Sequence, residues 1–128
     1  MKILLDTCVY LFASDEPERI PETIRDALIE PENDLYISIA SIWELLIKWK
    51  RGRMSIVGDP AIGIPQQCKK LDLAVLPLEL NAVLQSASLP DIHKDPFDRI
   101  LVCQARANDM IIVTPDEKIA AYDVETIW

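Results

Sequence analysis

The chain has 128 residues, half of them hydrophobic, which suits one domain over residues 1–128 and leaves little room for a second. A formal net charge of −8 argues against a protein that coats nucleic acid through a broadly basic surface, but it does not exclude a nuclease whose acids hold a cation. Scattered cysteines, with no signal peptide and no apolar run of about 20 residues, predict a cytoplasmic protein without a membrane segment.

Strands and helices are expected to alternate along the first half of the chain. Ile3-Leu4-Leu5 is a short apolar run typical of a buried strand, and Asp6 ends it. Gly52 is a typical stop signal for the helix that follows the second strand. In chain order, the expected elements are a strand at 3–5, helices at 7–13 and 22–30, a strand at 35–38, and a helix that starts at Ser38 or Ser41 and runs to about Arg51.

The second half continues the same alternation after a loop at 53–60. The expected elements are a helix at 61–71 interrupted by Pro65, a strand at 74–78, a helix at 79–88, a loop at 90–94, a helix at 96–108, a strand at 110–114, a helical turn at 117–122 and a last strand at 125–128. This order predicts an α/β fold with a central, mostly parallel sheet of about five short strands flanked by helices.

Four acidic residues stand out by position, and each has a local explanation as a helix cap: Asp6, Glu44, Asp98 and Asp116. Asp6 precedes a helix and is a preferred N-cap residue. Ser41-x-x-Glu44 has the spacing of a capping box. Asp95 and Asp98 flank Pro96 at another helix start, and Thr114-Pro115-Asp116 begins a helix in a similar way. Taken singly, each acid is more readily explained as a cap than as a catalytic group.

The expected topology brings these four acids to one edge of the sheet. In right-handed parallel α/β units, the helices before and after a strand both begin at the carboxyl edge. Asp6 and Asp116 follow strands, and Glu44 and Asp98 are expected in the first turns of such helices. Carboxylates gathered there repel one another unless they are protonated, and a hard divalent cation removes that conflict. The pattern favours a Mg²⁺ or Mn²⁺ site, with four separate caps as the alternative.

The acids belong to a longer series of motifs: Leu4-Leu5-Asp6-Thr7, Ser38-x-x-Ser41-x-Trp43-Glu44 with Ile47-Lys48, His93-x-Asp95-Pro96-Phe97-Asp98-Arg99 with Gln104-Ala105, Thr114-x-Asp116 and the closing Trp128. The series spans the chain and resembles PIN-domain toxins of the VapC type, most specifically in the segment from His93 to Arg99. The resemblance implies a PIN-like fold and a Mg²⁺- or Mn²⁺-dependent endoribonuclease that leaves a 5′-phosphate and a 3′-hydroxyl. It also implies an RNA substrate and a cognate antitoxin in a type II toxin–antitoxin module, and we expect a homodimer.

The resemblance further implies that the catalytic and metal-binding residues are Asp6, Glu44, Asp98 and Asp116. Supporting roles are expected for Asp95, Thr7, Thr114 and Arg99, with Arg99 beside a neighbouring acid or the RNA backbone. Cys8 stands where relatives often carry histidine, and we expect little effect because its side chain is not one of the acids. His93 is the only histidine, which excludes chemistry that needs two imidazoles, and we expect it to be structural.

Two alternative classes are also compatible with parts of this pattern. One is a PIN-fold interaction module without catalytic activity, although all four acids are present. The other is a receiver-like phosphotransfer domain, which also has an acidic edge. Receivers pair two acids after the first strand, whereas Asp6 stands alone.

The only dense basic stretch contains Lys48, Lys50, Arg51 and Arg53. Cations are favoured at a helix C-terminus, which explains most of this stretch without a ligand. Lys48 also has the i,i+4 spacing for a surface ion pair with Glu44.

Overall fold

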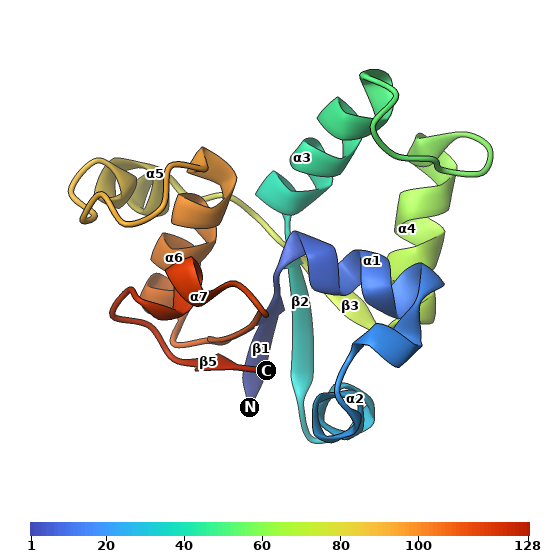
Figure 1. The fold of residues 1–128 in the computed structure, drawn as a ribbon, viewed down its shortest axis with the longest axis horizontal. Coiled ribbons are helices and arrows are strands. Elements are labelled where there is room, and N and C mark those ends of the chain that lie inside the picture. The colour runs from blue at the N-terminus through green and yellow to red at the C-terminus, as the bar shows by residue number, and fades with distance from the viewer.

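The computed structural model describes all 128 residues and has a central sheet flanked by helices (Figure 1). The strands are β1 (Lys2–Leu5), β2 (Asp34–Ser38), β3 (Leu73–Leu76), β4 (Ile111–Val113) and β5 (Thr126–Ile127). The helices are α1 (Thr7–Asp15), the 3₁₀ turn η1 (Pro17–Arg19), α2 (Glu22–Ile29), α3 (Ile39–Lys50), α4 (Pro60–Lys70), α5 (Leu80–Ser86), α6 (Pro96–Asn108) and α7 (Glu117–Ala120). No helix combines the length and apolar composition that a membrane span requires.

The predicted elements form, with shifted ends and one difference in α4. Pro65 lies inside α4 and does not interrupt it. Proline removes one backbone donor, but its fixed φ is compatible with a helix that tolerates the loss of one internal hydrogen bond. The short turn η1 is the one helical element that the sequence analysis did not anticipate.

All five strands run parallel in the order β3-β2-β1-β4-β5. This confirms the predicted parallel α/β architecture. The chain builds outward from β1 to β3, and then crosses to the other side of β1 to add β4 and β5. The strand order therefore reverses between β1 and β4, where open parallel sheets form a crevice at their carboxyl edge. Leu5 at the end of β1 pairs with Val113 at the end of β4, so the residues after both strands lie together.

Each face of the sheet carries its own core. Ile3 and Leu5 of β1 face a cluster that contains Val9 of α1, Ile24 of α2, Leu45 of α3 and Ile64 of α4. Leu4 points the other way, into a cluster with Ala82 of α5, Leu101 of α6 and Ile119 of α7. Figure 1 shows the two groups of helices on opposite sides of the strands. All three apolar residues of β1 are at most 1% exposed, as expected for a central parallel strand covered on both faces.

A buried hydrogen-bond network holds the start of α3 against α6. The Ser38 hydroxyl donates to Gln104 Oε1 and accepts from the backbone N–H of Ala40, which makes Ser38 the N-cap of α3. The Gln104 amide in turn donates to the carbonyl of Pro77, just after β3. One side chain of α6 thus ties together the carboxyl ends of β2 and β3 and the helix that carries Glu44.

Candidate active site

Asp6 lies directly after β1 and is 5% exposed. It occupies the N-cap position of α1, but its side chain makes no capping hydrogen bond. Its Oδ2 instead accepts from the Thr114 hydroxyl at 2.7 Å and lies 3.6 Å from the Cys8 sulfur. The interpretation of Asp6 as a simple helix cap is therefore wrong. Its carboxylate is turned towards the residues that follow β4, across the switch point of the sheet.

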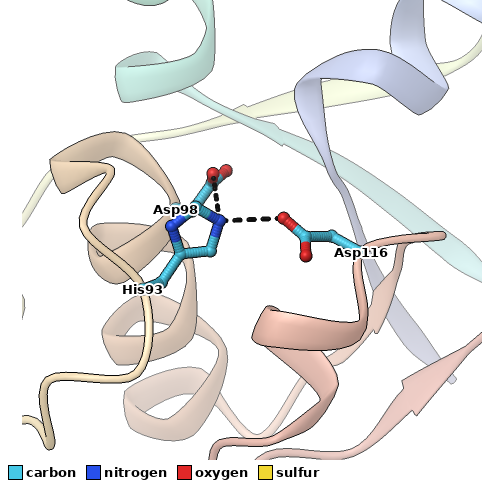
Figure 2. Close-up of side chains that lie close together, drawn as sticks. All are labelled: His93, Asp98 and Asp116. Atoms are coloured by element: carbon cyan, nitrogen blue, oxygen red, sulfur yellow. Dashed lines mark hydrogen bonds and ion pairs between the residues drawn. The ribbon is translucent and has the colours of Figure 1, made fainter.

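Asp98 and Asp116 approach each other through His93 (Figure 2). The Nε2 atom of His93 lies 2.8 Å from Asp116 Oδ2 and 3.0 Å from Asp98 Oδ2. Asp98 sits in the first turn of α6, as predicted, whereas Asp116 also caps α7 by accepting from the Lys118 N–H. Asp116 therefore acts as a helix cap through Oδ1 and also faces the other acids through Oδ2.

The protonation of His93 follows from its other ring nitrogen. The backbone N–H of Asp95 donates to Nδ1 at 3.1 Å, so Nδ1 offers its lone pair and the ring proton of the neutral form is on Nε2. A protonated Nε2 donates to carboxylates and has no lone pair for a metal ion. His93, Asp98 and Asp116 each offer one possible ligand atom, and these three atoms lie within 4.8 Å of one another, a spacing that would suit a metal ion. The hydrogen bond from Asp95 instead makes His93 a donor that orients the two acids.

Glu44 is 6% exposed but does not occupy the predicted position. Because Ser38 caps α3, the helix begins at Ile39 and Glu44 falls in its second turn, so the expected capping box with Ser41 is wrong. Glu44 Oε2 pairs with Lys48 Nζ at 3.1 Å, the predicted i,i+4 pair. Its Oε1 is buried without a hydrogen-bond partner, as are the hydroxyls of Ser41 and Thr7. A buried carboxylate oxygen without a donor requires a cation or water nearby.

Burial, and after it the neighbouring charges and hydrogen bonds, shifts the pKa values of the acids. Burial, followed by the charges of Asp6, Asp95, Glu44 and Asp116, raises the pKa of Asp98 to about 8. Burial also raises the pKa of Asp6, although the hydrogen bond from Thr114 partly opposes it. Burial pushes the pKa of Asp116 upward as well, but hydrogen bonds from His93 and Lys118 outweigh it and lower the pKa. A cation beside Asp98 would offset the neighbouring negative charges that contribute to its raised pKa.

The predicted acids are thus gathered to different degrees. Asp98 and Asp116 share one donor, and Asp6 and Glu44 lie outside that tight group but close enough to raise the pKa of Asp98. Carboxylate oxygens, together with the unpartnered oxygen of Glu44, match the ligands that Mg²⁺ and Mn²⁺ prefer. The residues present fit a divalent cation.

Two neighbours of the acids were not placed in the site by the sequence. His93 was expected to be structural, and it contacts two of the four acids. Cys8 was not counted among the acids and was expected to have little effect, and its thiol contacts Asp6. Burial and then the charge of Asp6 raise the pKa of Cys8 to about 12, so the thiol stays protonated and donates to that carboxylate. For His93, the available signal in the sequence was its position two residues before Asp95, the N-cap of α6.

The supporting residues divide into two kinds. Thr114 contacts Asp6 directly, and Asp95 caps α6 by accepting from the Phe97 N–H. Arg99 does not reach an acid of the site. Its guanidinium donates to the carbonyls of Ser86, Leu89, Pro90 and His93 and to the Tyr122 hydroxyl, and only the fully exposed Asp91 approaches it, at 3.8 Å. Arg99 therefore fixes the loop that carries His93.

A cluster of acids at the switch point of a parallel sheet defines an α/β protein whose carboxyl edge is acidic. The chain matches the PIN domain family over residues 3–125, and it belongs to that family. No curated protein sequence matches the chain.

Among solved structures, the fold is similar to chains in structures of VapBC and FitAcB proteins. One such chain comes from VapBC2 of Rickettsia felis bound to a DNA fragment from its promoter. Its TM-score is 0.73 at 14% identity, and the match covers 99% of this chain and 98% of that chain. A chain of DNA-bound VapBC from Salmonella typhimurium has a TM-score of 0.68 at 18% identity, covering 99% and 97%. A chain of FitAcB from Neisseria gonorrhoeae has a TM-score of 0.63 at 20% identity, covering 98% and 96%.

Proposed function

We propose that this chain is a metal-dependent endoribonuclease of the VapC type, the toxin of a type II toxin–antitoxin module, acting as one PIN domain over residues 1–128 in the cytoplasm. The observation that carries the proposal is the gathering of acids around Asp98, whose pKa is raised to about 8. The likeness to chains of VapBC and FitAcB complexes supports the toxin assignment.

Asp6, Asp98, Asp116 and Glu44 are the residues that would hold Mg²⁺ or Mn²⁺. When bound, the cation supplies a water of lowered pKa and neutralises charge on an RNA phosphodiester. Thr114 partly opposes the rise in the pKa of Asp6 by donating to its carboxylate, and the Nε2–H of His93 holds Asp98 and Asp116 side by side. Arg99 and Tyr122 fix the backbone on both sides of His93, so the donor is already in place before RNA binds. Preorganised acids cost little reorganisation during the reaction.

The proposed partners are a cognate antitoxin and a second copy of the chain. Exposed apolar side chains support a protein interface, in particular Leu80 (72% exposed) and Leu84 (65% exposed) on α5. Large apolar side chains that are left in water together mark surfaces that other proteins cover.

The test is cleavage of mixed single-stranded RNA by the purified protein with Mn²⁺, with Mg²⁺ and with EDTA. We expect cleavage with either cation, none with EDTA, and none by the Asp98→Asn variant. The matched control is Asp26→Asn, which removes the same charge from an exposed position on α2. Equal cleavage by Asp98→Asn and the control would refute the catalytic assignment. An inert interaction module would cleave in no condition, and a receiver-like domain would instead take up label from acetyl phosphate.

A further inference from the structure

A basic groove includes one of the four acids, Glu44, in its lining. It runs between the C-terminal half of α3 and the segment that leads into α6, and its lining includes Lys48, Arg51, Arg53 and Lys94. Glu44 belongs to the same lining, so the groove opens directly from one of the four acids. Phe97 contributes an apolar wall, and Asp95 is the second acid in the lining. Four cations thus meet two carboxylates here, on a chain whose net charge is −8.

The end of α3 is shaped to bring its cations together. The N–H of Gly52 donates to the Trp49 carbonyl, and the N–H of Arg53 donates to the Lys48 carbonyl, which is the Schellman pattern. Gly52 has a φ of +71°, a left-handed conformation that side chains other than glycine rarely adopt. The chain therefore folds back on the last turn of the helix, and Arg53 returns to the level of Lys48 instead of leaving the site.

The helix dipole does not account for this groove. It favours cations in the last turn of α3, such as Lys48, but Arg53 lies beyond the helix and Lys94 comes from a distant segment. Lys48 is paired with Glu44, whereas Arg51, Arg53 and Lys94 form no ion pair. Three unpaired cations that converge from two segments repel one another, and an anionic ligand removes that repulsion.

We propose that this groove binds the phosphate backbone of single-stranded RNA next to the bond that is cut. The proposal rests on the nuclease function and adds the path of the substrate. A groove with several cations can follow the backbone of one strand, whose phosphates recur along the chain. Contacts of this kind position the strand without reading its sequence. Because Glu44 lines the groove, a strand held there lies beside one of the four acids.

The test measures binding of a fluorescently labelled single-stranded RNA to the Asp98→Asn protein in EDTA, so that cleavage cannot interfere. The groove variant carries Arg51→Ala and Arg53→Ala, and the matched control carries Lys69→Ala and Lys70→Ala. Both lose two exposed cations from the end of a helix, and Lys69 and Lys70 lie outside the groove. Titrations at several salt concentrations separate phosphate contacts from other effects.

The expected result follows from counterion release. Three phosphate contacts to a single strand, one for each unpaired cation, give a salt slope of roughly −2.1, so affinity falls about 20-fold when salt rises fourfold. Removing two contacts reduces the slope to roughly −0.7 and the fall to about threefold. The control should keep the full slope. An equal loss of slope in both variants, or no loss in the groove variant, would overturn the proposed path.

Cleavage assays separate this proposal from the nuclease function. If the wild-type chain cuts RNA with Mn²⁺ and the groove variant binds RNA as tightly as the control, the groove is refuted and the nuclease stands. If binding depends on Arg51 and Arg53 but the wild-type chain never cuts RNA, the groove stands and the nuclease is refuted. If the wild-type chain cuts RNA but the groove cations serve only to bind an acidic protein segment, RNA affinity will not change and the proposal falls.

Discussion

Replacing Asp98 by asparagine should stabilise the protein when no metal is present. The pKa of Asp98 is raised to about 8 in the folded protein, from an ordinary value of 3.8. Near pH 7.5 the unfolded chain has this acid ionised, so folding must either take up a proton or bury a repelled charge. A difference of about four pKa units corresponds to about 5 kcal/mol. Asparagine removes the charge and can still accept the hydrogen bond from His93 Nε2.

The sign of the pH dependence provides an internal check. A carboxyl group whose pKa is raised on folding contributes stability below the unfolded pKa and loses it as pH rises towards the folded pKa. The free energy of unfolding of the metal-free wild type should therefore fall between about pH 4 and pH 8, by up to about 1.4 kcal/mol per pH unit. At pH 5 the advantage of Asp98→Asn should shrink to less than about 2 kcal/mol.

Urea denaturation in EDTA at pH 5 and at pH 8 measures both effects, with Asp26→Asn as the control for charge. Mn²⁺ should reverse the order, because it stabilises the wild type by mass action and has a weaker site in the variant. A metal-free Asp98→Asn protein that is less stable than the wild type at pH 8 would contradict the repulsion on which the site depends.

Three further predictions concern the groups around the acids. His93→Leu should weaken Mn²⁺ binding by roughly tenfold or more, because Asp98 and Asp116 lose their shared donor. The measurement is the Mn²⁺ concentration at which half of the metal-induced rise in melting temperature is reached. If that concentration is the same as in the wild type, the ring has no orienting role. Gln104→Leu should lower the free energy of unfolding by about 3 kcal/mol, since Ser38 and the Pro77 carbonyl lose buried partners, and a loss below about 0.5 kcal/mol would contradict the network. Arg99→Met should speed amide hydrogen exchange in the segment 86–93, and unaltered exchange there would show that the guanidinium does not hold the loop.

Much of the fold could be predicted because local and global signals agree. The apolar run Ile3-Leu4-Leu5 is buried on both faces, as a central parallel strand must be. Asp95 caps α6, and Gly52 ends α3 in a left-handed conformation, both from residue types that are strongly favoured at those helix positions. The ends of helices were less certain where two candidate caps lay close together. Ser38, and not Ser41, is the N-cap of α3, and its hydroxyl also bonds to Gln104, which is far away in the sequence.

The site was predictable in its acids but not in its donors. Strand order and helix direction suffice to bring Asp6, Asp98 and Asp116 to one edge, since parallel strands end together. The contact of His93 with Asp116 depends instead on how a loop is folded, and that loop is held by Arg99 and Tyr122 through backbone carbonyls. Such contacts follow no periodicity, so a linear pattern of residue types does not contain them.

The reversal of strand order between β1 and β4 has a consequence for how the protein is made. The acidic cluster joins residues from opposite ends of the chain, because the hydroxyl of Thr114 donates to Asp6, which lies 108 positions earlier. While the ribosome still holds the last strands, Asp6 and Glu44 are exposed to the cell without Asp98 and Asp116 in place. A nascent chain that has not yet released β4 therefore lacks the hydrogen bond between Thr114 and Asp6, and the acidic cluster forms only after this segment has left the ribosome.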